Sequence, residues 1–115
     1  MGYRVIEEIV RIELTPQGFP FFETDSQHGI KIEMSEDESN ELSELDISGN
    51  SASLRRLGEI LIAISKSKDY HVHLESKSPS VLVIEPSGLR LTISNSDKLT
   101  RDAVSKSEPP DWARG

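Results

Sequence analysis

The sequence predicts an α+β fold, in which one major helix packs on one face of a mostly antiparallel sheet of about five to six strands. Two observations predict this fold. Several short segments alternate apolar and polar residues, as strands with one buried face do, and one longer segment repeats leucine and isoleucine at helical spacing. Because 115 residues supply one hydrophobic core, we expect a single domain over residues 1–104 and a polar tail over 105–115.

The first segment, Tyr3–Leu14, fits two kinds of element. Its first half spaces apolar residues as a helix does, and its second half alternates them as a strand does. Its richness in β-branched residues favours a strand. A predicted loop around Pro20 follows, and its three phenylalanines are expected to anchor in the core more readily than to form a binding patch: Phe19, Phe21 and Phe22.

Two half-buried strands are predicted next, at Gly29–Met34 and Leu45–Ser48, because both segments alternate apolar and charged residues. The residues between them are rich in glutamate, serine and asparagine, with almost nothing apolar. We therefore expect an acidic, solvated loop over about residues 35–44.

The segment between Gly49 and Tyr70 is the strongest helix signal in the chain, because leucine and isoleucine recur in it at spacings of three and four. Asn50 and the serines that follow it offer oxygens for an N-cap. We expect a helix from Ser51 to about Ser67. The face toward the sheet is predicted to contain Leu54, Leu57, Leu61 and Ile64.

Three further strands are predicted, at Tyr70–Glu75, Val81–Glu85 and Leu89–Ser94. The turn residues Pro86–Gly88 predict a hairpin between the last two. A strand, the helix and a strand in succession also suggest a parallel crossover from Leu45–Ser48 to Tyr70–Glu75. The sheet side of the core is predicted to contain Val72, Leu74, Leu82 and Ile84, with Leu91 or Ile93.

The charge of the chain is concentrated in one segment. The net charge is −7, and the segment from Glu33 to Asp46 carries seven acids and no lysine or arginine. Outside it, 13 acids balance 13 bases, so the clustered cations of a nucleic-acid-binding surface are missing. We therefore expect no direct binding to nucleic acid. The acidic segment is interpreted either as a solvated loop or as a surface that steers a basic partner.

His71, His73 and Glu75 alternate along a predicted strand and therefore project from one face of it. Three interpretations remain open. The row is a solvent-facing row on the side of the sheet opposite the helix, a surface that binds a partner, or a pair of metal ligands with a third supplied by the carboxylate. Two histidines do not complete a metal site, so we predict no metal and no cofactor.

Other chemistry is not indicated. The chain has no cysteine, which excludes disulfides, thiolate metal sites and cysteine nucleophiles. It has no phosphate-binding glycine loop and no Gly-x-Ser-x-Gly elbow. No apolar run has the length of a membrane span, and the first residues lack the order of a secretory signal, so we expect a cytoplasmic protein that does not bind a membrane and has no catalytic residues.

Four pieces of the sequence together resemble the immunity protein 32 family of bacterial polymorphic-toxin systems. They are Leu45-Asp-Ile-Ser-Gly-Asn50, Leu54-Arg-Arg-Leu57 with Leu61, His71-Val-His-Leu74 and Leu82-Val-Ile-Glu85. The His-x-His-Leu piece is the most distinctive of them. The long N-terminal section and the strand Leu89–Ser94 with its tail depart from the family pattern. The resemblance implies an intracellular protein that binds and neutralises a cognate toxin without catalysis.

The sequence therefore predicts a non-catalytic immunity protein whose partner is a toxin domain, expected to be basic. The alternatives are a small metal-binding protein or metal-dependent enzyme using His71, His73 and Glu75, and an adaptor domain that binds a peptide or protein on a sheet face or edge. The candidate partner-binding residues are Glu36, Asp37, Glu38, Glu41, Asp46, His71, His73, Glu75 and Arg90.

Overall fold

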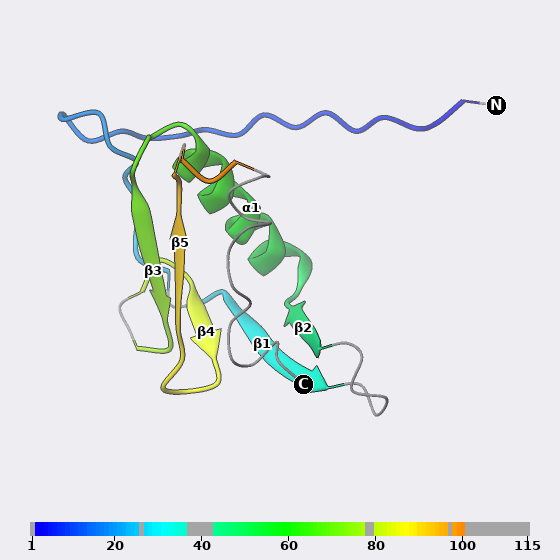
Figure 1. The fold of residues 1–115 in the computed structure, drawn as a ribbon. Coiled ribbons are helices and arrows are strands. Elements are labelled where there is room, and N and C mark those ends of the chain that lie inside the picture. The colour runs from blue at the N-terminus through cyan, green and yellow to red at the C-terminus, as the bar shows by residue number, and fades with distance from the viewer. Residues whose placement is uncertain (1, 26, 37–42, 78–79, 97, 101–115) are drawn as a thin grey trace.

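The computed structural model describes residues 2–25, 27–36, 43–77, 80–96 and 98–100. Within these residues the chain forms one helix and five strands, which confirms the predicted α+β fold. The order is β1 (Gly29–Glu36), β2 (Ser43–Ser48), α1 (Ser51–Ser65), β3 (His71–Glu75), β4 (Val83–Glu85) and β5 (Arg90–Ser94), as Figure 1 shows.

The strands form two groups. One is a three-stranded sheet in the order β2-β1-β4, in which β1 pairs antiparallel with β2 and parallel with β4. The other is the antiparallel pair β3-β5. β3 lies beside β4 without pairing with it.

The hairpin predicted over residues 81–94 is wrong, because β4 pairs with β1 and β5 pairs with β3. The chain does turn at the predicted place, where the N–H of Leu89 donates to the carbonyl of Pro86 at 3.2 Å and Gly88 has a φ of 86°. A turn reverses the chain, but the neighbours that each strand finds decide its pairing. The predicted parallel crossover is also wrong, because β2 and β3 lie in different sheets.

The acidic segment is partly strand. The predicted loop over residues 35–44 begins within β1 and ends within β2, whose cross-strand pairs extend as far as Glu36 opposite Ser43. Residues 37–42 lie outside the described part of the chain. Cross-strand pairing therefore continues beyond the point at which apolar alternation stops.

Helix α1 begins as predicted. The N–H of Ser53 donates to the Asn50 Oδ1 at 2.9 Å, which satisfies one of the backbone donors at the helix start. At the other end, the N–H of Lys66 donates to the carbonyl of Ala63. The helix is two residues shorter than the predicted limit at Ser67.

The predicted core face of α1 is wrong for two of its four residues. Leu54 is 43% exposed and Leu61 is 45% exposed. Because α1 carries leucine or isoleucine on two neighbouring stripes, spacing alone does not distinguish the stripe that faces the strands. The buried stripe contains Ser53, Ile60, Ala63 and Ile64, with Leu57 packed against its edge.

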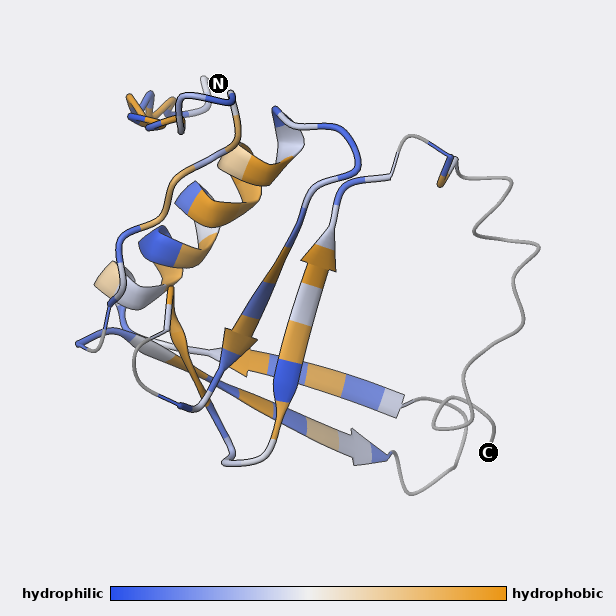
Figure 2. Ribbon diagram, turned by 90° about the vertical axis from the view of Figure 1, so that its left-hand side faces the viewer, coloured by the Kyte–Doolittle hydropathy of each residue, from blue (hydrophilic) through white to orange (hydrophobic). Residues whose placement is uncertain are grey.

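The core lies between α1 and the inward faces of the strands, and the strand residues predicted for it are confirmed. Val72, Leu74, Leu82 and Ile84 are buried, and Leu91 and Ile93 pack against them while partly exposed. Figure 2 shows the cause, because hydrophobic and hydrophilic residues alternate along the strands. The core cluster consists of Ile30, Ile32, Ile60, Ile64, Val72, Leu74, Leu82 and Ile84.

The segment Tyr3–Leu14 is neither the predicted strand nor a helix. It runs past α1 as an extended arm, in which only Leu14 forms a bridge, with Pro20 (Figure 1). The arm is held at Glu8, whose carboxylate accepts from Arg55 at 2.8 Å and raises the pKa of that guanidinium. β-branched residues favour an extended backbone, but an extended segment becomes a strand only where a neighbouring strand accepts its hydrogen bonds.

The three phenylalanines divide between core and surface. Phe22 packs against the core, as predicted. Phe19 and Phe21 are each 50% exposed, so the prediction of core anchoring is wrong for them. Phe19 instead stacks on Tyr70, with ring centroids 6.0 Å apart, and the Tyr70 hydroxyl donates to the carbonyl of Pro20. These contacts fasten the loop around Pro20 to the start of β3.

Candidate functional site

The outward face of the β3-β5 pair carries a continuous row of polar side chains, which we call the polar ladder. The strands are in register, so His71 lies opposite Ser94, His73 opposite Thr92 and Glu75 opposite Arg90. The residues between them, such as Val72 and Ile93, point to the core. The prediction that His71, His73 and Glu75 share one face is therefore confirmed, and β5 adds Arg90, Thr92 and Ser94 to it.

Direct contacts order the polar ladder. A hydrogen bond of 2.7 Å joins the His73 Nδ1 to the Thr92 Oγ1, and the Arg90 Nη2 lies 2.7 Å from the Glu75 Oε1. The His71 and His73 rings meet edge to face, with centroids 4.9 Å apart. The Arg90 side chain is 61% exposed, so its cation remains accessible. The ladder thus presents an arginine and two imidazoles on a rigid pair of strands.

The same contacts bear on the metal alternative. The Glu75 carboxylate, which was the expected third ligand, is engaged with Arg90. In the described part of the chain, no three histidine or acidic side chains converge as a metal site requires. His71 and His73 offer at most two ligands, and the His73 Nδ1 is already hydrogen-bonded to Thr92.

The acidic candidates lie elsewhere. Glu36 ends β1 and Asp46 lies in β2, where it faces Glu33 across the strand pair. Asp37, Glu38 and Glu41 lie outside the described residues. Glu36 and Asp46 therefore lie in a different sheet from the polar ladder, and among the described residues the structure does not bring these two acids and the ladder together in one site.

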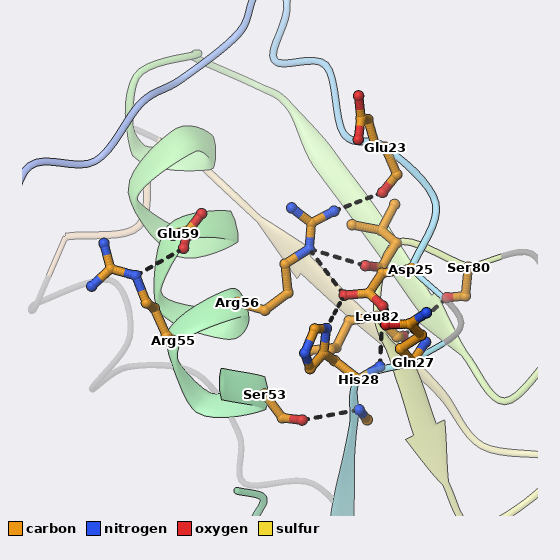
Figure 3. A network of polar contacts seen from close by, with 12 residues as sticks. Glu23, Asp25, Gln27, His28, Ser53, Arg55, Arg56, Glu59, Ser80 and Leu82 are labelled. Carbon is orange, nitrogen blue, oxygen red and sulfur yellow. Dashed lines mark hydrogen bonds and ion pairs between the residues drawn. The ribbon is translucent and has the colours of Figure 1, made fainter. Parts of the chain in front are cut away.

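A second polar cluster, which the sequence analysis missed, joins the loop before β1 to the helix (Figure 3). The His28 Nδ1 lies 2.6 Å from the Asp25 Oδ2, and Arg56 approaches the same oxygen at 4.0 Å. Arg56 also donates to the carbonyls of Glu23 at 2.6 Å and Val81 at 3.3 Å. Arginine on a helix normally indicates a solvated face, so no pattern in the sequence indicates this cluster.

This cluster is suited to holding the fold together. A histidine that a carboxylate orients can act as a catalytic base, but among the described residues no serine or threonine hydroxyl bonds to the His28 ring. Its contacts instead connect three segments, since the N–H of Asp25 donates to the Ser80 carbonyl and the N–H of Gly29 donates to the Ser53 Oγ at 3.1 Å. We assign it a structural role.

Comparison with known proteins gives a match over the part of the chain that contains α1 and four of the strands. A family model matches the chain from just after the start of β2 to just beyond β5. Residues 44–100 match the immunity protein 32 family. The comparisons with curated proteins and with solved structures give no significant match.

The immunity protein 32 match confirms the resemblance noted in the sequence and supports a general role as an immunity protein. It includes the whole polar ladder and Asp46, whereas Asp25 and His28 lie before it. In the described residues, no helix has the length and apolar character of a membrane span.

The contacts that Asp25 makes with His28 and Gln27 shift the pKa of its carboxyl group. Burial of the carboxyl group acts to raise its pKa, but the hydrogen bonds from His28 and from the N–H groups of Gln27 and His28 outweigh burial and hold the pKa below its ordinary value of 3.8. Folding therefore favours the ionised carboxylate.

Replacement of Asp25 with asparagine is expected to lower the free energy of unfolding by about 1–2 kcal/mol at pH 7, because it removes charge-assisted hydrogen bonds from a mostly buried group. The ionised carboxylate stabilises the fold fully above the unfolded pKa, and this contribution is lost as the pH falls through the lower, folded pKa. Urea unfolding of both proteins at pH 7 and at about pH 3 measures the difference. Glu23→Gln is the matched control, since Glu23 contacts Arg56 through its carbonyl. An equal Asp25→Asn effect at both pH values would contradict the assignment.

Proposed function

We propose that this chain is a non-catalytic immunity protein that binds a cognate toxin domain and blocks it in the cytoplasm, with the polar ladder as a principal contact surface. The observation that carries the proposal is the immunity protein 32 match, which includes β3 and β5 entirely. The ladder is exposed, and its backbone is fixed by cross-strand pairing. Such a surface binds without losing much conformational entropy.

The chemistry of the ladder supports recognition of another protein. Arginine is enriched where protein interfaces carry their binding energy, and imidazoles stack as well as form hydrogen bonds. Arg90 is already oriented by Glu75, so a partner carboxylate or carbonyl meets a positioned guanidinium. The proposed contact is therefore specific in geometry, whereas the acidic segment acts over a longer range.

The acidic segment supports a basic partner. All of the excess negative charge lies between Glu33 and Asp46, and concentrated charge accelerates encounter with an oppositely charged surface. The proposal gives the two surfaces different tasks. The acidic segment speeds association, and the ladder slows dissociation.

The test is protection from a toxin domain, which is first sought among the genes adjacent to the one that encodes this chain. Cells that express the toxin domain alone are expected to stop growing, and cells that also express this chain are expected to grow. The purified proteins should then form a stoichiometric complex in size-exclusion chromatography. Growth arrest that persists in the presence of well-expressed chain would contradict the proposed function for that toxin.

Within that complex, Arg90→Ala is expected to raise the dissociation rate about three- to tenfold while changing the association rate little, because a contact at the interface acts mainly after encounter. Surface plasmon resonance with the purified toxin domain measures both rates. Arg11→Ala is the matched control, since Arg11 is also an exposed arginine paired with a glutamate, at 3.3 Å. If Arg90→Ala and Arg11→Ala changed the dissociation rate equally, the polar ladder would not be part of the interface.

A further inference from the structure

The β1-β2 pair is exposed on both of its faces beyond the point where the helix covers it. We call residues 31–36 and 43–48 the ribbon. All of β2 is exposed, and so is β1 from Glu33 onward. Three large apolar residues in the ribbon are exposed too, with Met34 at 58%, Leu45 at 52% and Ile47 at 45%, whereas Ile32 at its inner end is buried in the core. Exposed apolar residues that lie together in this way form a candidate interaction surface.

The two faces of the ribbon differ in chemistry. Ile32 lies opposite Ile47 and Met34 opposite Leu45, so one face is apolar and continues the core side of the sheet outward from Ile30. The other face carries Lys31 opposite Ser48, Glu33 opposite Asp46, and Ser35 opposite Glu44. One face of the ribbon is therefore apolar as far as Met34 and Leu45 and ends in the polar pair Glu36 and Ser43, and the other face is mainly acidic.

The acidic face is poorly arranged for the stability of the free chain. Glu33 and Asp46 are directly opposite each other, and like charges at such positions repel. The one cation on this face, Lys31, lies 3.1 Å from the Glu33 carboxylate. A basic surface placed against this face would relieve the repulsion, so the charge pattern indicates the sign of the partner.

We propose that the ribbon enters a cleft of the toxin domain that has one apolar wall and one basic wall. This inference rests on the proposed function and adds a second contact surface, in a different sheet from the polar ladder. Met34, Leu45 and Ile47 meet the apolar wall. Glu33, Glu44 and Asp46 meet the basic wall.

A second copy of this chain fits the ribbon less well. Pairing two copies through β2 would bring Glu44 and Asp46 of each copy close to the acids of the other. Acidic side chains on an edge strand oppose such pairing. The charge pattern therefore favours a basic partner over self-association.

The test compares two exposed leucines in the full chain, and the probe is the toxin domain against which the wild-type chain protects. Leu45→Ser is expected to raise the dissociation rate of the complex about fivefold, and Leu61→Ser, at a matched 45% exposure on the helix, less than twofold. Met34→Ser repeats the test on the neighbouring strand. Urea midpoints of all three variants are expected to lie near that of the wild type. If Leu45→Ser and Met34→Ser both unfolded the chain, the apolar face would be required for folding, and the proposal would be wrong.

The acidic face has its own variant. Asp46→Asn is expected to slow association about two- to threefold at low salt, with the difference shrinking at high salt. It is also expected to raise the urea midpoint of the free chain, because it removes the like charge opposite Glu33. Glu23→Gln, at an exposed position outside the ribbon, should do neither. If Asp46→Asn lowered the urea midpoint, Asp46 would stabilise the free chain, and this part of the proposal would be wrong.

The outcomes separate the inference from the function on which it rests. A wild-type complex that Leu45→Ser and Met34→Ser leave unchanged would overturn the ribbon while leaving the proposed function standing. Failure of the wild-type chain to bind or protect would overturn both. Sedimentation tests for self-association. If the wild-type chain were a dimer that Leu45→Ser dissociates, the apolar face would bind a second copy of the chain, and the proposal of a toxin cleft would be wrong.

Discussion

Truncation of Ile60 to alanine is expected to lower the free energy of unfolding by about 2–5 kcal/mol. Ile60 is fully buried in α1 and belongs to the cluster that joins the helix to the inward faces of the strands. Truncation removes buried methylene and methyl groups, and the surrounding strands close the resulting cavity only in part. The effect is large relative to the total stability of a domain of this size.

The neighbouring Leu61 is the control for this prediction. It lies on the adjacent stripe of the same helix and is 45% exposed, so Leu61→Ala is expected to cost less than about 1 kcal/mol. Urea unfolding followed by circular dichroism measures both variants. A larger loss for Leu61→Ala than for Ile60→Ala would mean that α1 is rotated relative to the described packing.

A fall of about tenfold or more in the rate of toxin association is expected when Glu36, Asp37 and Glu38 are replaced together with serine, measured at low salt. These residues contribute three of the charges in the segment that carries all of the excess negative charge. Long-range attraction acts before contact, so the dissociation rate should change little. Salt screens the attraction over a Debye length of about 8–10 Å, so the difference should shrink as salt is added.

Stopped-flow or surface-plasmon measurements at two salt concentrations give these rates. Replacing Glu7, Glu13 and Glu23 with serine removes the same charge from other parts of the chain and should slow association much less. If the variant associates as fast as the wild type, Glu36, Asp37 and Glu38 have no steering role. This result would leave the polar ladder and the ribbon as the proposed contact surfaces.

If both surfaces act as proposed, the chain meets its partner through two separate sheets. The polar ladder occupies the β3-β5 pair, and the ribbon occupies the far edge of the β2-β1-β4 sheet. The kinetic tests address different steps, since the charge variants act on association, whereas Arg90→Ala and Leu45→Ser act on dissociation. An increase in the dissociation rate for only one of Arg90→Ala and Leu45→Ser would show which of the two sheets contacts the toxin.

Local sequence determined most of the elements and one surface. The start of α1 follows from Asn50, because the side chain that caps a helix is local to it. The polar ladder follows from alternation along Tyr70–Glu75 and Leu89–Ser94, because successive side chains of any strand point to opposite faces. For the same reason Val72, Leu74, Leu82 and Ile84 were predictable as core residues.

The tertiary structure alone decided which segments meet. The parallel pairing of β1 with β4, the buried stripe of α1 and the unpaired arm before Leu14 each depend on a neighbour that is distant in sequence. The cluster of Asp25, His28 and Arg56 is of the same kind, since it joins a loop to a helix at sequence separations that no local pattern records. Backbone periodicity shows which face a side chain occupies, whereas the identity of the contacting element depends on how the whole chain buries its apolar surface.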